Sequence, residues 1–159
     1  MIHHISIAVE NPARVAQALG ELLNAEVAPF PPCPGSYIII PFDEHGTAIE
    51  VYPAGIELVP GHGDDQVQFV QNPNPSRYIS VHAAISVPVS QAKVEEVAAR
   101  EGWRAVLCDR DGFFEVIEVW VENRIMLELL PPVLAARYLE FTRPHNARQF
   151  IETATPVGV

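Results

Sequence analysis

Basic residues, cysteines and long apolar runs are all scarce in this sequence. Ten Lys and Arg residues stand against twenty Asp and Glu residues, which gives a net charge of −10. Nucleic acids and anionic membranes both require clustered positive charge on their partners, so we expect neither as a partner here. No stretch approaches the roughly 18 consecutive apolar residues of a membrane-spanning helix.

The two cysteines, Cys33 and Cys108, have neither the spacing of a metal site nor that of a disulfide framework, which is typical of a reducing compartment. The first residues are strand-like, so we expect no secretory signal. These features predict a soluble, acidic, cytoplasmic protein. Its 159 residues, 48% of them apolar, suffice for one domain or for two small merged ones.

An internal repeat is the strongest feature of the sequence. Residues 4–9 read HISIAV and residues 82–87 read HAAISV, 78 positions later. An apolar run with one carboxylate follows each of them, AIEVY at 48–52 and MLELL at 126–130, and the two carboxylates, Glu50 and Glu128, are again 78 positions apart. A fixed offset of this kind indicates a duplicated structural unit.

Each half of the sequence predicts the order β-α-β-β-β. In the first half we expect strands at 2–9, 27–28, 36–41 and 47–52, with a helix between Asn11 and Asn24. In the second half we expect strands at 78–87, 103–108, 113–121 and 124–130, with a helix between Ser90 and Gly102. Residues 53–77 carry loop signals, apart from a possible short strand at 56–59.

The predicted fold is therefore α+β, with two βαβββ modules in tandem that form a cupped mixed sheet with helices outside. We place the first module at 1–54, a linker at 55–77, the second module at 78–131 and a helical C-terminal extension at 132–159, broken at Pro144. The extension lies outside the repeat, and we expect it to pack on the outer face or to form a dimer contact.

Strand alternation places His4, Ser6 and Ala8 on one face, and it leaves that face open beside the histidine. A single histidine at the start of a strand is more often hydrogen-bonded than a metal ligand. Two imidazoles and two carboxylates at matched offsets, however, suit a divalent transition metal, and a carboxylate among apolar residues needs a partner. The alternative is a repeat that has lost its metal and has kept a polar pocket.

The remaining histidines and the cysteines are weaker candidates. His3 points to the face opposite His4, His45 and His62 lie in predicted turns, and we expect His145 in the tail to be structural. Neither cysteine has a basic neighbour in the sequence that would activate it as a nucleophile.

The paired β-α-β-β-β repeat, with His in the first strand and Glu in the fourth, resembles the vicinal oxygen chelate superfamily over residues 1 to about 131. That superfamily includes glyoxalase I, methylmalonyl-CoA epimerase, fosfomycin-resistance proteins, extradiol dioxygenases and bleomycin-resistance proteins. The resemblance implies a divalent metal (Zn, Ni, Mn, Co or Fe) at four filled positions: His4, Glu50, His82 and Glu128.

Four filled positions favour the lyase, isomerase and epimerase branch. The resemblance then implies a metal that polarises a carbonyl or enediolate oxygen of a small substrate, with Glu128 or Glu50 as the base that moves the adjacent proton. The sequence departs from glyoxalase I in that few basic residues lie near the predicted pocket to hold the carboxylates of glutathione. The only candidates are Arg77, Arg104, Arg110 and Arg124.

Two other hypotheses on function stay open. The first is a metal-free binding protein for a drug or an aromatic ligand, as in the bleomycin-resistance proteins. The second is a dimeric fold without a surviving site. We expect a homodimer, and the superfamily permits a cup within one chain or a cup shared between protomers.

Overall fold

The computed structural model describes residues 2–153, and its first module has the predicted element order. The strands are β1 (His4–Val9), β2 (Glu26–Pro29), β3 (Tyr37–Ile40) and β4 (Ala48–Pro53), and the helix is α1 (Pro12–Leu23). The four strands form one mixed sheet in the order β1-β4-β3-β2, in which β1 and β4 run parallel. β1 is therefore an edge strand.

Local sequence signals fix both ends of α1, as predicted. The Asn11 side chain accepts a hydrogen bond from the backbone N–H of Arg14, and Pro12 occupies the first turn, where its missing N–H costs nothing. Asn24 ends the helix in the left-handed conformation, with a φ of 52°.

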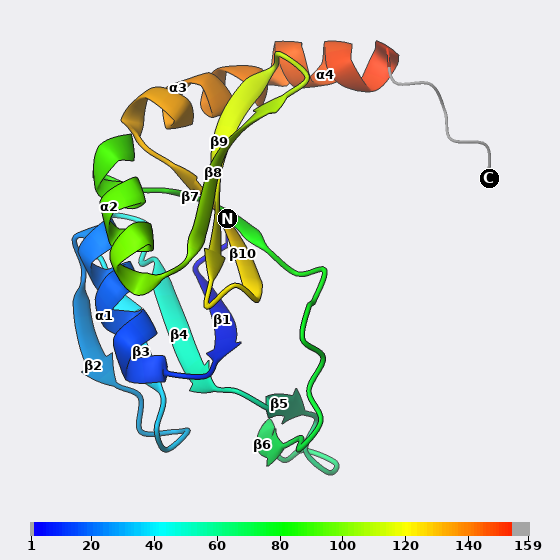
Figure 1. Ribbon diagram of the computed structural model, residues 1–159. Helices are drawn as coiled ribbons and strands as arrows, with labels where there is room; N and C mark the ends of the chain where they lie inside the picture. Colours follow the sequence, from blue (N-terminus) through cyan, green and yellow to red (C-terminus); the bar gives the residue numbers. More distant parts are fainter. Residues whose placement is uncertain (1, 154–159) are drawn as a thin grey trace.

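The second module repeats the arrangement of the first. Its elements are β7 (Ala83–Ser86), α2 (Gln91–Glu101), β8 (Arg104–Arg110), β9 (Phe114–Val121) and β10 (Ile125–Leu130). The strand order is β7-β10-β9-β8, with β7 and β10 parallel. Ser90 caps the start of α2 and Gly102 ends it, which confirms both predicted helix limits. The predicted α+β fold of two such modules is correct (Figure 1).

Each sheet buries the face that touches its helix. In the first module Ile49 and Val51 of β4 are buried with Leu19 and Leu22 of α1, and the equivalent residues of β10, Leu127 and Leu129, are buried as well. These residues belong to one apolar cluster that runs through both modules. Glu50 and Glu128 alternate with them and therefore lie on the other, open face of each sheet.

The connection between the modules has more structure than predicted. β5 (Ile56–Val59) was foreseen as a short strand, but β6 (Gln68–Gln71), which pairs with it as a separate hairpin, was not. The strand predicted at 78–87 is shorter in the structure, because β7 begins only at Ala83. The polar, Pro-rich sequence around β6 does not indicate a strand, because β6 is stabilised by pairing with β5 rather than by burial.

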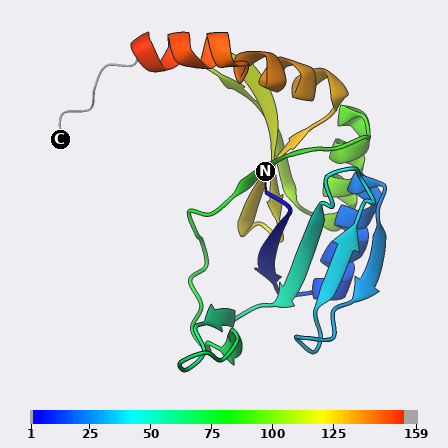
Figure 2. The ribbon, with the colours of Figure 1, turned by 180° about the vertical axis from the view of Figure 1, so that it is seen from behind.

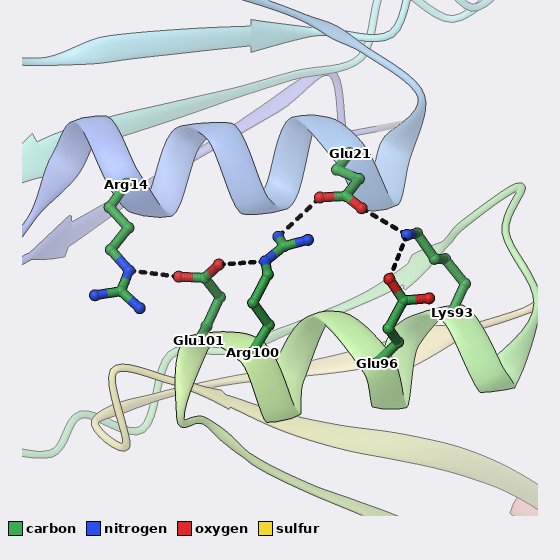
Figure 3. A network of polar contacts seen from close by, with 6 residues as sticks. All are labelled: Arg14, Glu21, Lys93, Glu96, Arg100 and Glu101. Carbon is green, nitrogen blue, oxygen red and sulfur yellow. Dashed lines mark hydrogen bonds and ion pairs between the residues drawn. The ribbon is translucent and has the colours of Figure 1, made fainter.

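The two modules contact each other through their helices. Figure 1 and Figure 2 show α1 and α2 side by side on one flank of the molecule, while the connection arches along the opposite flank. Alternating charges join the helices: Arg14 pairs with Glu101, and Glu21 pairs with both Lys93 and Arg100 (Figure 3). Arg100 and Lys93, in this order of effect, lower the pKa of Glu21 to about 2.

A second contact joins the end of β1 to the turn between β9 and β10. The Glu122 carboxylate accepts hydrogen bonds from the backbone N–H groups of Glu10 and Asn11, and Arg124 pairs with Glu10. The packing between modules within one chain thus uses helix surfaces and a turn.

The C-terminal extension consists of α3 (Pro132–Phe141) and α4 (Pro144–Thr153), separated near Pro144 as predicted. α3 lies against β9, where Tyr138 packs on Phe114 and Arg137 pairs with Glu115. Residue 1 of the expected first module and residues 154–159 of the expected extension lie outside the described residues. Of the helices in 2–153, none combines the length and apolarity that a membrane crossing requires.

Candidate functional site

The first half of the candidate site lies on the open face of the first sheet. The register of β1 and β4 places Ser6 directly opposite Glu50, and His4 precedes Ser6 by two residues on the same face. Ser6 donates a hydrogen bond of 2.9 Å to the Glu50 carboxylate, and the Tyr52 hydroxyl donates to the same oxygen. Glu50 is therefore held by two neutral hydroxyl groups, with an exposed imidazole diagonally across from it.

Tyr52 is the most buried of these side chains, at 5% exposure. Burial, followed by the negative charge and hydrogen bond of Glu50, raises the pKa of Tyr52 to about 12. The hydroxyl consequently keeps its proton at neutral pH and remains a donor to Glu50.

The second half of the site repeats this placement with different partners. Ala84 lies opposite Glu128 in the parallel pair of β7 and β10, and the exposed His82 precedes Ala84 by two residues. Ala84 cannot donate a hydrogen bond. Instead, the Arg110 guanidinium contacts Glu128 at 2.5 Å, and the side chain of Glu128 is only 13% exposed. The same repeat position therefore carries a charge-neutralised carboxylate.

Arg110 connects Glu128 to a second carboxylate. Glu118 lies opposite Glu128 in the pairing of β9 and β10, and Arg110 contacts it at 2.9 Å. Like charges directly opposite in a sheet repel each other, so the guanidinium between them is needed. Arg110 lowers the pKa of Glu118, and its two carboxylate partners, Glu128 first, raise the pKa of Arg110.

The structure does not gather the four predicted ligands within one chain. His4 and Glu50 form one half-site and His82 and Glu128 form another, on two separate sheets. Across residues 2–153, no three His, Cys, Asp or Glu side chains form a group that could hold a metal ion. β1 and β7, which carry or adjoin the histidines, are each paired along one edge only within the described sheets.

The weaker candidates lie outside the two half-sites. His3 uses Nδ1 to contact the backbone oxygen of His45 at 2.6 Å, and His145 is exposed at the start of α4. Cys33 is buried, and burial together with Glu118 raises the pKa of the Cys108 thiol, which disfavours a nucleophilic thiolate.

The roles of Ser6, Tyr52 and Arg110 were not foreseen. Strand alternation placed Ser6 on the face of His4, and the same period of two puts Tyr52 on the face of Glu50. This alternation was the available signal. Arg110 was named only as a residue near the predicted pocket. No local signal pointed to its pairing with Glu128, because it lies 18 positions before Glu128 and meets it only across the β8-β9-β10 register.

We compared the sequence and the structure of this chain with those of known proteins. No model of a known protein family matches the chain, and no curated protein gives a match. The fosfomycin-resistance protein FosX from Listeria monocytogenes matches structurally with a TM-score of 0.55 at 14% identity, over 86% of this chain and 97% of that one. A mutant of that FosX, in complex with Mn(II) and 1S,2S-dihydroxypropylphosphonic acid, matches with a TM-score of 0.53 at 12% identity, over 88% and 96%.

A putative glyoxalase family protein from Bacillus anthracis matches with a TM-score of 0.50 at 15% identity, over 81% of this chain and 92% of that one. At these identities the likeness concerns the fold. The chain therefore shares its fold with fosfomycin-resistance and glyoxalase family proteins, and this is the fold that its repeat predicted.

Proposed function

We propose that this chain is one subunit of a metal-dependent enzyme of the vicinal oxygen chelate type, with a site that two chains complete together. The observation that carries the proposal is the equal placement of His4 with Glu50 and of His82 with Glu128. In each module the histidine precedes by two residues the position that pairs with the glutamate.

The donor set fits a divalent transition metal, because two imidazoles and two carboxylates are the ligands that such ions prefer. Each half-site supplies one of each type, and a single chain keeps the two apart. Both half-sites adjoin an edge strand, and an unpaired edge is a natural place for a second chain. A homodimer in which β1 of one chain lies beside β7 of the other would bring all four ligands to one point.

A bound metal of this kind supplies Lewis-acid polarisation of a substrate oxygen, which acidifies the adjacent carbon. Glu50 is then the better candidate for the base that takes the proton. Its partners Ser6 and Tyr52 are neutral donors that orient the carboxylate, whereas the charge of Glu128 is already neutralised by Arg110. The proposed reaction is proton transfer in a small carbonyl or hydroxy-acid substrate, as in lyases, isomerases and epimerases.

The complex of the Listeria FosX mutant with Mn(II) and a dihydroxy phosphonic acid supports a metal and a small oxygen-rich ligand for this fold. A second function is favoured by a different observation. Glu50 and Glu128 both have donors already, so a metal-free pocket for a small ligand needs no further partner for either carboxylate.

Metal content separates the two functions. The purified protein, incubated with manganese, nickel, cobalt or zinc and desalted, is analysed by mass spectrometry beside His82→Ala and Glu128→Gln. We expect about one metal per chain in the parent protein and a loss of metal in both variants. A metal-free parent protein would overturn the enzyme proposal in favour of the binding protein.

A mixed dimer tests the sharing of the site. One chain carries His4→Ala and Glu50→Gln, and the other carries His82→Ala and Glu128→Gln. If two chains share each site, the mixed dimer has one site with all four native ligands and one with none, so it binds one metal. If each chain forms its own site, every site has lost two ligands and the mixed dimer binds none.

A further inference from the structure

A cavity of about 310 Å³ adjoins the Glu50 half-site. Ser6, Ala8 and Tyr52 of the first sheet line it, the connection between the modules covers it, and Arg124 of the β9-β10 turn and Ile125 of β10 close one side. Small-molecule sites begin at about this volume. The cavity is built from both modules and the connection of a single chain.

The connection is tied to both modules around this cavity. Arg77 and Ile79 line the cavity, while Tyr78 between them turns to the other side and packs edge-on against Trp120 of β9, with ring centroids 6.3 Å apart. The guanidinium of Arg77 lies 5.3 Å from the ring centroid of Tyr78. This cation-π contact and the aromatic pair hold Arg77 beside the cavity.

Of the two arginines that line the cavity, Arg77 is the one for which the described residues provide no ion pair with a carboxylate. Eight other Lys and Arg side chains of the described residues have at least one carboxylate within 4.0 Å, and Arg124 on the same cavity pairs with Glu10. In a protein of net charge −10, a basic side chain left without an acidic partner beside a cavity is positioned for an anion from outside.

The polar part of the lining selects for a hydroxyl group. Ser6 and Tyr52 give their protons to Glu50, so their own oxygens can only accept hydrogen bonds from a ligand. A ligand hydroxyl satisfies this requirement and a ligand carbonyl does not. Apolar residues make up most of the remaining lining: Ile7, Ala8, Ile56, Leu58, Pro75, Ile79 and Ile125. Ser76 and Glu57 also line the cavity, and the Glu57 carboxylate accepts a hydrogen bond from the Asn72 side chain.

We infer that this cavity binds a small hydroxy carboxylic acid with an apolar body. Its carboxylate pairs with Arg77, its hydroxyl donates to Ser6 or Tyr52, and its apolar part packs against the isoleucines. As an assignment of substrate class this rests on the proposed function, since it places the ligand hydroxyl beside Glu50. Binding itself uses no metal ligand.

Calorimetric binding of three probes to chelator-treated protein tests the inference. The probes are 3-phenyllactate, 3-phenylpropionate, which lacks the hydroxyl group, and 3-phenylpropane-1,2-diol, which lacks the carboxylate. We expect 3-phenyllactate to bind at least tenfold more tightly than either of the other two. Equal binding of all three, or no binding of 3-phenyllactate, would overturn the inference.

Single substitutions test which side chain binds the carboxylate of the ligand and which binds its hydroxyl group. Arg77→Gln should weaken 3-phenyllactate binding at least tenfold and leave diol binding unchanged, and Arg77→Lys should restore part of the loss. Tyr52→Phe should reduce the preference for 3-phenyllactate over 3-phenylpropionate. The matched control is Arg137→Gln, which removes a 59% exposed arginine on α3, away from the cavity. An equal loss in Arg137→Gln would contradict the role of Arg77.

Because the protein in this assay is free of metal, its outcome is independent of the metal analysis. Probe binding without metal uptake would leave the ligand class standing and remove the enzyme proposal. Metal uptake without probe binding would support the enzyme proposal and overturn the inferred ligand class.

Discussion

The two modules carry the same repeat and hold its central carboxylate in different ways. In the first module Glu50 accepts hydrogen bonds from two hydroxyl groups, those of Ser6 and Tyr52. In the second module Ala84 stands where Ser6 stands in the first, and Arg110 contacts Glu128 instead. A duplicated backbone fixes where a carboxylate lies. The neighbouring strands decide whether hydroxyl groups or a cation satisfy it, and hence which chemistry it is free to perform.

The largest losses of stability should come from core substitutions, and they should be equal in the two modules. Ile49 and Leu127 are equivalent in the repeat, and both are almost fully buried in the shared core. Ile49→Ala and Leu127→Ala should each lower the free energy of unfolding by about 2–5 kcal/mol, because each leaves a cavity in that core. Urea denaturation should show a single transition in both variants. Two separate transitions would show that the modules unfold independently.

The next effect should appear in the second module only. Arg110→Gln leaves Glu118 and Glu128 opposite each other without a cation, and should cost about 1–3 kcal/mol at pH 7 after allowance for the partial exposure of Arg110. Arg110 depresses the pKa of Glu118, so it stabilises the fold above the ordinary carboxyl pKa, and this stabilisation is lost as pH falls through the depressed value.

Urea denaturation at pH 7 and at pH 3 checks this prediction. The difference between Arg110→Gln and the parent protein should shrink at the lower pH, because the stabilisation that Arg110 provides through the depressed pKa of Glu118 is then lost. A difference that is independent of pH would mean that Arg110 acts through packing rather than through charge.

A smaller effect should appear in the first module only. Tyr52→Phe removes one hydroxyl donor to Glu50 and should cost about 1 kcal/mol. Since the pKa of Tyr52 is raised to about 12, folding favours the protonated phenol, and this contribution is present below pH 10 and is lost between pH 10 and pH 12.

Ultraviolet absorbance of tyrosinate as a function of pH measures the titration. One of the four tyrosines of the parent protein should titrate near pH 12, and that step should be absent in Tyr52→Phe. If the step at about pH 12 persists in the variant, another tyrosine is responsible.

The smallest effect should come from the surface between the modules. Glu21 lies in the charge network of α1 and α2, where its pKa is lowered to about 2 (Figure 3). Its ion pairs contribute stability above the ordinary carboxyl pKa of 4.5, which is lost as pH falls toward 2. Because the network is solvent-exposed, Glu21→Gln should lower the melting temperature only slightly at low salt and not at all at high salt. A decrease that persists at high salt would contradict a purely electrostatic role.

Much of the fold followed from the sequence, because it depends on local chemistry. The alternation of Ile5, Ile7 and Val9 with His4 and Ser6 identified the buried and open faces of β1, and Asn11 with Pro12 marked the start of α1. β6 was missed because its residues form a strand only through pairing with β5, and a pairing partner is not visible in a local pattern.

For the site, the sequence alone determined which residues repeat and on which face they lie, since an offset of 78 and a period of two are properties of one strand at a time. The contacts of those residues, in contrast, depend on tertiary structure. Arg110 reaches Glu128 across three strands, Tyr52 and Ser6 share one oxygen of Glu50, and the two half-sites stay apart because the modules pack helix to helix. Contacts between distant segments depend on register and on the packing of whole modules, and no local pattern of residues encodes either.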